Sequence, residues 1–147
     1  MLTGEFRAAL DDNGRLLIPT KLRSEFQGDT LILTKAIDKC LWLFSPTKWE
    51  VFSKTIQESL GMFSSRDLMI QRRIIGSALE IEVDKTGRIG VSSLLREYAG
   101  LVKDCVVVGI RTHLEIWDES AFMAYQEATN ENLPGLVQGL SIAWPKE

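Results

Sequence analysis

Apolar and polar residues alternate along two stretches of the chain, and a polar turn interrupts each stretch. The apolar positions are Phe6, Ala8, Leu10, Leu16 and Ile18 in the first stretch, and Leu79, Ile81, Val83, Ile89 and Val91 in the second. A period of two residues is typical of a half-buried β-strand. Each stretch is therefore predicted to form two strands joined by a turn.

The same further elements are expected after each of these hairpins. A short helix is expected at Thr20–Phe26, with Pro19 near its opening position, and another at Ser93–Tyr98. Compact apolar strands are expected at Leu31–Thr34, Leu41–Phe44, Cys105–Val108 and Leu114–Trp117. Ser45 and Asp118 then occupy equivalent positions, and both are good helix N-cap residues.

Two helices are expected between the two halves. Trp49, Phe52, Ile56 and Leu60 form one apolar stripe after Ser45, as on an amphipathic helix. A second helix is expected at about residues 66–75. The predicted organisation is a first unit at 1–50, a helical linker at 51–77, a second unit at 78–125 and a C-terminal tail at 126–147.

The two units share one sequence plan. Leu10–Arg23 aligns with Val83–Arg96 at an offset of 73 positions, and Cys40–Trp49 aligns with His113–Phe122 at the same offset. Leu31–Thr34 aligns with Val106–Gly109 after a slip of two residues. A unit of about 45 residues cannot bury enough apolar surface to fold alone. We expect one β-rich α+β domain in which the copies pair through interleaved hairpins about a pseudo-twofold axis, rather than two independent domains.

The loop length of each hairpin decides which side chains face outward. A two-residue turn at Asn13-Gly14 would place Ile89 and Val91 of the second copy on the wrong face. A three-residue loop, with the glycine in the left-handed position, places Leu10 opposite Leu16 and Val83 opposite Ile89 on the inner side. Asp11 then faces Arg15, and Asp84 faces Arg88, on the outer side. These pairs either stabilise the turns or hold each guanidinium ready for a phosphate or a guanine.

Charge is unevenly distributed along the 147 residues, whose formal net charge is −3. A slightly acidic protein is a poor default candidate for nucleic-acid binding. However, the segment from Arg7 to Arg23 contains four basic and two acidic residues, and the segment from Asp84 to Arg96 contains three basic residues and one acidic residue. The segment after Glu115 is acidic. The chain could therefore present a basic face, although scattered solvated charges are the alternative interpretation.

Several other protein classes are disfavoured by the sequence. The longest apolar runs are far shorter than the roughly 18 residues that a membrane span needs, and the N-terminus lacks the pattern of a secretory signal. Cys40 and Cys105 are interpreted as small buried residues rather than a disulfide or metal pair, and His113 as a strand-end residue. No catalytic set, metal cluster or phosphate-binding glycine loop is found, so an enzyme, a cofactor and a small-molecule substrate are not expected.

The doubled Asp-x-x-x-Arg motif, together with VVVGIRTHLEIWD, resembles the MraZ family over residues 1 to about 125. The resemblance implies two tandem AbrB-like swapped-hairpin units that form a double-split β-barrel, with linker and C-terminal helices. It implies a cytoplasmic, nucleoid-associated transcriptional regulator that assembles as a closed homo-oligomeric ring. Such a regulator binds repeated short boxes in double-stranded DNA and usually represses its own operon for cell division and cell-wall synthesis.

The resemblance implies that the DNA-binding residues are Arg15 and Arg88, together with Asp11 and Asp84 of the same motifs. The local cations Arg7, Lys21 and Arg23 are further candidates for phosphate contacts. The second copy departs from the first, with Gly90-Val91-Ser92 in place of Leu17-Ile18-Pro19. Two alternatives stay open: an AbrB-like antitoxin or protein-binding module that uses the apolar residues of the tail, and a structural ring-former without DNA binding. The apolar tail residues are Leu133, Leu136, Val137, Leu140, Ile142 and Trp144.

Overall fold

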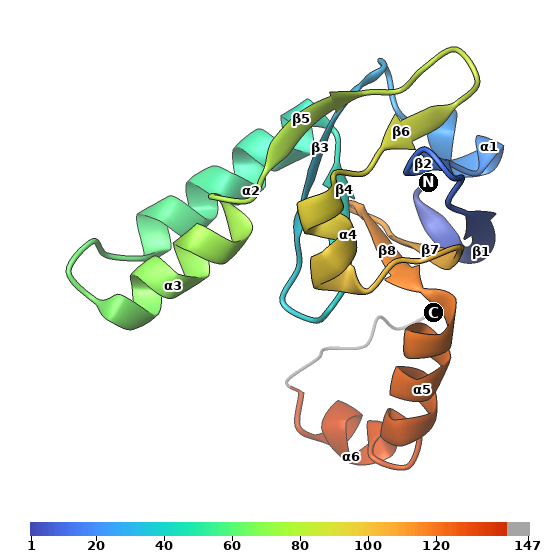
Figure 1. Ribbon diagram of the computed structural model, residues 1–147. Helices are drawn as coiled ribbons and strands as arrows, with labels where there is room; N and C mark the ends of the chain where they lie inside the picture. Colours follow the sequence, from blue (N-terminus) through green and yellow to red (C-terminus); the bar gives the residue numbers. More distant parts are fainter. Residues whose placement is uncertain (141–147) are drawn as a thin grey trace, which may run out of the picture.

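A computed structural model describes residues 1–140 and shows a six-stranded antiparallel sheet with a two-stranded ribbon beside it (Figure 1). The sheet has the order β1-β7-β8-β4-β3-β5, and the ribbon pairs β2 with β6. The strands are β1 (Thr3–Ala9), β2 (Arg15–Leu17), β3 (Thr30–Lys35), β4 (Leu41–Phe44), β5 (Leu79–Glu82), β6 (Arg88–Gly90), β7 (Asp104–Ile110) and β8 (Leu114–Asp118). The predicted β-rich α+β class is confirmed as a mixed fold dominated by an antiparallel sheet.

Each of the two sheets contains strands of both halves. The first strand of each half pairs with the other half, because β1 pairs with β7 and β5 pairs with β3. The ribbon likewise joins β2 of the first half to β6 of the second. Neither half therefore completes its sheet without the other, and the prediction that the hairpins interleave is confirmed.

The equivalent strands of the two halves are β1 and β5, β3 and β7, and β4 and β8. When each is exchanged for its equivalent, the strand order of the six-stranded sheet is the same read from the other edge, as a pseudo-twofold axis requires. Two pairs of residues face their own equivalents: Leu16 lies opposite Ile89 in the ribbon, and Trp42 lies opposite Glu115 between β4 and β8. The axis therefore passes through the ribbon and through the middle of the large sheet.

One detail of the predicted repeat is wrong. Ala8 pairs with Cys105, and its equivalent Ile81 pairs with Leu31, so Leu31 corresponds to Cys105 and the slip is one residue rather than two. The reason is that successive side chains along a strand point to opposite faces of the sheet, so a shift of one residue exchanges the two faces. Leu31 and Cys105 both pack in the core between ribbon and sheet, whereas Val106 packs on the opposite face of the sheet.

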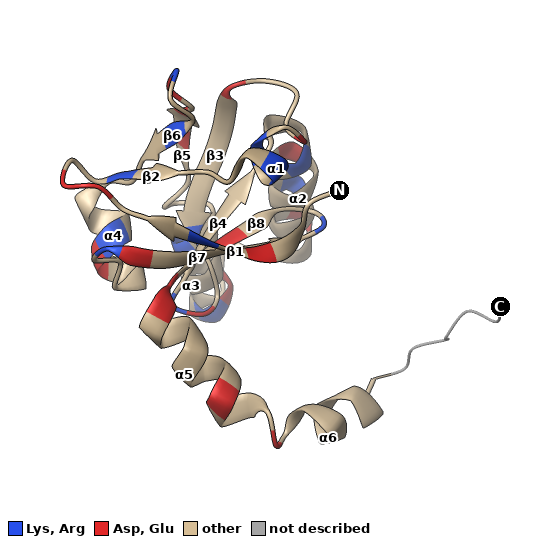
Figure 2. Ribbon diagram, turned by 90° about the vertical axis from the view of Figure 1, so that its right-hand side faces the viewer, with Lys and Arg blue, Asp and Glu red and all other residues tan. Residues whose placement is uncertain are grey.

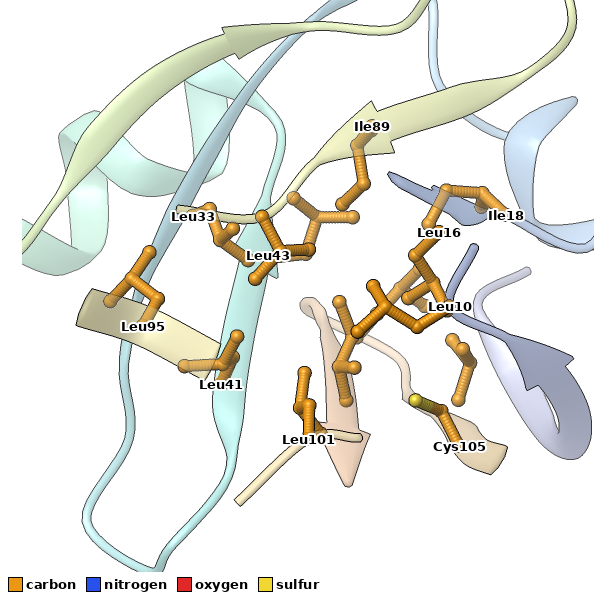
Figure 3. Close-up of a cluster of buried hydrophobic side chains, with 14 of the residues drawn as sticks. Leu10, Leu16, Ile18, Leu33, Leu41, Leu43, Ile89, Leu95, Leu101 and Cys105 are labelled. Atoms are coloured by element: carbon orange, nitrogen blue, oxygen red, sulfur yellow. The ribbon is translucent and has the colours of Figure 1, made fainter. Parts of the chain in front are cut away.

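The main core lies between the ribbon and the sheet. Leu16, Ile18 and Ile89 point from the ribbon side towards Leu41 and Leu43 of β4, and all five are fully buried (Figure 3). Leu95, on the helix α4 (Ser93–Ala99), and Leu101, just after this helix, belong to the same core. Cys40 and Cys105 are also fully buried and are not disulfide-bonded, which agrees with their interpretation as small core residues.

The helices lie around this β structure. They are α1 (Thr20–Arg23), α2 (Pro46–Ser59), α3 (Ser65–Ile74), α4 (Ser93–Ala99), α5 (Glu119–Thr129) and α6 (Leu133–Gln138). The predicted N-caps are confirmed, because Ser45 accepts a hydrogen bond from the N–H of Lys48 and Asp118 accepts one from that of Ala121.

The linker helices α2 and α3 extend to one side of the molecule, and β2, β6 and α1 lie on the other (Figure 1). Within residues 1–140, no helix combines the length and the apolar character that a membrane span requires.

Candidate nucleic-acid interface

The first hairpin turns through a three-residue loop, as predicted. Leu10 bridges to Leu16, and the N–H of Asp11 donates to the carbonyl oxygen of Arg15 over 2.8 Å. Gly14 has a φ of +74°, a conformation that a residue with a Cβ atom adopts only under strain. The Oδ1 atom of Asp11 accepts hydrogen bonds from the N–H groups of Asn13 and Arg15, both over 2.9 Å. One carboxylate oxygen is therefore committed to the turn.

The second hairpin repeats this geometry at Asp84. Its Oδ1 atom accepts from the N–H groups of Thr86 and Arg88 and from the Thr86 hydroxyl, and Gly87 has a φ of +83°. These bonds stabilise the ionised carboxylate. They lower the pKa of Asp84 to about 2, with the Thr86 hydroxyl as the largest cause and with Arg15 contributing.

The second oxygen of each aspartate faces the arginine of the other hairpin. Nη1 of Arg15 donates to Oδ2 of Asp84 over 2.9 Å, and Nε of Arg88 lies 3.9 Å from Oδ2 of Asp11. The predicted pairing of side chains within one hairpin, Asp11 with Arg15 and Asp84 with Arg88, is therefore wrong. Within a hairpin the arginine gives its backbone N–H to the aspartate, and the antiparallel pairing of β2 with β6 carries its guanidinium across to the other copy.

These residues form one outward surface, which we call the ribbon face: Asp11, Arg15, Leu17, Asp84, Arg88 and Gly90. Their neighbours Leu16 and Ile89 are fully buried, whereas the side chains of Arg15 and Arg88 are 55% and 37% exposed. Figure 2 shows the basic residues of β2 and β6 on these neighbouring strands. The two loops lie at opposite ends of the ribbon, because Arg15 pairs with Gly90 and Leu17 with Arg88, yet the arginines share one face.

The ribbon face suits directed hydrogen bonding rather than bulk attraction of anions. Its two arginines and two aspartates leave no net charge. A guanidinium carries five N–H donors, and the bond from Arg15 to Asp84 uses one of them. Arg15 is thus oriented by a hydrogen bond to a carboxylate and Arg88 lies at ion-pair distance from one, while both side chains remain partly exposed.

Two further arginines hold the loops in place. A Cβ atom on Gly87 would overlap the guanidinium of Arg23, and one on Gly14 would overlap that of Arg96. Each arginine therefore packs against the turn of the other unit. Sequence reasoning assigned Arg23 to phosphate contact and missed Arg96, although Arg96 is its equivalent in the repeat and could have been found from that alignment. Lys21 is exposed on α1, two residues before Arg23.

The structure does not bring Arg7 to the ribbon face. Phe6 and Ala8 pack against the main core, so Arg7, which alternates with them on β1, points to the opposite side of the sheet. Its Nε atom lies 3.7 Å from Oε2 of Glu119 on α5. Arg7 therefore stands apart from the other candidate residues.

A metal centre is not evident in the part of the chain that the structure describes. Within residues 1–140, His, Cys, Asp and Glu side chains do not gather in groups of three that could hold an ion. The exposed chemistry of the ribbon face is that of guanidinium donors, carboxylates and one leucine.

Comparison with known proteins gives a consistent result over most of the chain. The family model described as "MraZ protein, putative antitoxin-like" matches residues 1–72 and 74–134. A protein of Treponema denticola named "Transcriptional regulator MraZ" is 37% identical over 95% of this chain and 96% of its own length. A protein of the same name from Symbiobacterium thermophilum is 43% identical over 95% of this chain and 99% of its own length.

Proposed function

The chain belongs to the MraZ family, and from that premise we propose that it is a transcriptional regulator that binds double-stranded DNA through its ribbon face. The observation that carries the proposal is the exposure of Arg15 and Arg88 on one face of a two-stranded ribbon, each beside a carboxylate. The major groove of B-form DNA admits such a ribbon, and arginine in the groove recognises guanine through two hydrogen bonds.

The roles of the site residues follow from their contacts. Arg15 and Arg88 contact base edges or phosphates, while Asp11 and Asp84 orient them from the opposite hairpin. Lys21 supplies a phosphate contact beside the ribbon. Arg23 contributes mainly by packing on Gly87, and Arg7 takes part only if the DNA reaches the opposite side of the sheet.

The finer proposals concern assembly and target. We propose that residues 1–50 and 78–125 are two AbrB-like units of a double-split β-barrel, with a linker at 51–77 and a tail at 126–147. Copies of the chain would form a closed ring in the cytoplasm, at the nucleoid. Two arginines per chain give weak binding, but several ribbon faces on repeated boxes gain avidity through effective concentration. We infer repression of the chain's own operon for cell division and cell-wall synthesis.

One observation favours a second function, that of an antitoxin or protein-binding module. Leu133, Leu136 and Leu140, in and after α6, are 55%, 61% and 58% exposed. Val137 is also exposed, and the other two predicted tail residues, Ile142 and Trp144, lie outside the described residues. A second protein that copurifies with the chain and is lost on substitution of these leucines would support this alternative.

The test is a salt-titrated gel shift on DNA from upstream of the chain's own gene and on random duplex. Arg15→Ala and Arg88→Ala are compared with Arg66→Ala, a matched control on α3 whose side chain is 81% exposed and distant from the ribbon. We expect Arg15→Ala to lose about 1–3 kcal/mol of binding free energy and to lower the salt dependence, with the oligomeric state unchanged. Equal binding by all variants would overturn the site, and equal binding of upstream and random DNA would overturn the regulator.

A further inference from the structure

The pseudo-twofold symmetry of the ribbon face is broken at one position. Exchange of the units maps Asp11 onto Asp84 and Arg15 onto Arg88, so the charged residues of the face are duplicated. The same exchange maps Leu17 onto Gly90. The face therefore has an apolar side chain at one end and an open position at the other.

The structure shows what surrounds each of these two positions. Leu17 lies directly opposite Arg88, and Gly90 lies directly opposite Arg15. Leu17 is 41% exposed and lies between the fully buried Leu16 and Ile18, so its side chain points away from the core that they form. Apart from Gly90 itself and its two chain neighbours, no atom of the described residues would lie within 4 Å of a Cβ atom on Gly90. Among the described residues there is therefore room for a side chain at position 90, and Leu17 is not part of the main core.

DNA offers one apolar group in the major groove, the C5-methyl group of thymine, and apolar side chains recognise it by contact. A ribbon whose arginines point into the groove would carry Leu17 to the base edges beside those that Arg88 reaches. The equivalent place beside Arg15 would meet only the backbone of Gly90.

We propose that Leu17 is a specificity-determining residue that recognises a thymine methyl group on one side of the DNA box. On the other side of the DNA box, Gly90 has no side chain that could contact a thymine methyl group. The nearly symmetric ribbon face thereby binds an asymmetric box in a single orientation. This inference rests on the proposed DNA binding of the ribbon face and adds the class of base and the residue that reads it.

The experiment removes one methyl group at a time from the DNA. A duplex is selected by the wild-type chain from a randomised pool, and each thymine is replaced in turn by deoxyuridine. We expect one thymine per box whose replacement weakens binding by about fourfold, as for loss of one buried methyl group. Leu17→Ala is expected to bind the thymine and deoxyuridine duplexes equally. Leu79→Ala, a control at a leucine of β5 that is 45% exposed, is expected to keep the fourfold difference.

The exchange variant Leu17→Gly/Gly90→Leu tests the orientation. Because Gly90 has open space and an ordinary φ, the variant is expected to fold, and its sensitive thymine should move to the other side of the box. Wild-type binding that no deoxyuridine weakens, or that Leu17→Ala leaves just as sensitive, would overturn the role of Leu17 while the proposed function stands. A wild-type chain that selects no duplex would overturn the proposed function itself.

Discussion

Protonation of His113 is expected to destabilise the fold below neutral pH, because its imidazole is buried among aromatic rings. The ring stacks on Phe44 at a centroid distance of 4.4 Å and lies edge-on to Trp42 at 5.1 Å. Nδ1 bonds the hydroxyl of Thr112, whereas Nε2 is buried without a hydrogen-bond partner in the described part of the chain. Burial lowers the pKa of His113 from 6.5 to about 4, and the nearby Glu115 only partly opposes this effect.

The size of the effect follows from the difference between the two pKa values. A histidine with a lowered pKa in the folded state contributes stability above pH 6.5 and loses it as the pH falls towards 4. Each pKa unit corresponds to about 1.4 kcal/mol, so the wild-type chain should lose roughly 2 kcal/mol by about pH 5 and roughly 3 kcal/mol below pH 4.

The assay compares urea denaturation of the wild type and His113→Phe from neutral pH down to about pH 5. Phenylalanine keeps a ring against Phe44 and Trp42 but cannot be protonated, so the difference between the two curves isolates the histidine from the carboxylates. His113 is the single histidine of the chain, so its NMR titration gives the pKa directly. A titration near 6.5, or the same loss of stability in both proteins, would refute the reasoning.

Two further predictions concern the ribbon. Gly87→Ala is expected to destabilise the fold by about 1–2 kcal/mol, because the φ of Gly87 is positive and the added methyl group would displace the Arg23 guanidinium. The control Gly90→Ala should change the thermal midpoint little. Equal thermal midpoints of the two variants would contradict this prediction. Leu16→Ala is expected to lower the free energy of unfolding by about 3–5 kcal/mol in urea, because Leu16 is fully buried beneath the ribbon; a loss below about 1 kcal/mol would show that the core is not packed there.

Much of the fold follows from the alternation of residues and the repeat. The three-residue loops at Asp12–Gly14 and Lys85–Gly87 were predictable, because the shorter turn would turn Ile89 and Val91 out of the core. The caps at Ser45 and Asp118 were predictable because capping is local.

The partners of Arg15 and Arg88 could not be predicted in the same way. Each hairpin alone places its own aspartate beside its own arginine, and the crossing depends on how β2 pairs with β6. Two strands of three residues carry too little pattern to fix that pairing. The repeat alignment could have singled out Arg96 as the equivalent of Arg23, but its packing on Gly14 joins residues of different units and likewise depends on how the units pair.

The pairing of β1 with β7 has a consequence for synthesis of the chain. Thr3 lies opposite Ile110, so β1 leaves the ribosome long before its partner β7. During that interval an unpaired strand edge is exposed to other nascent chains. Contacts so distant in sequence also slow folding, so the completed sheet should form late.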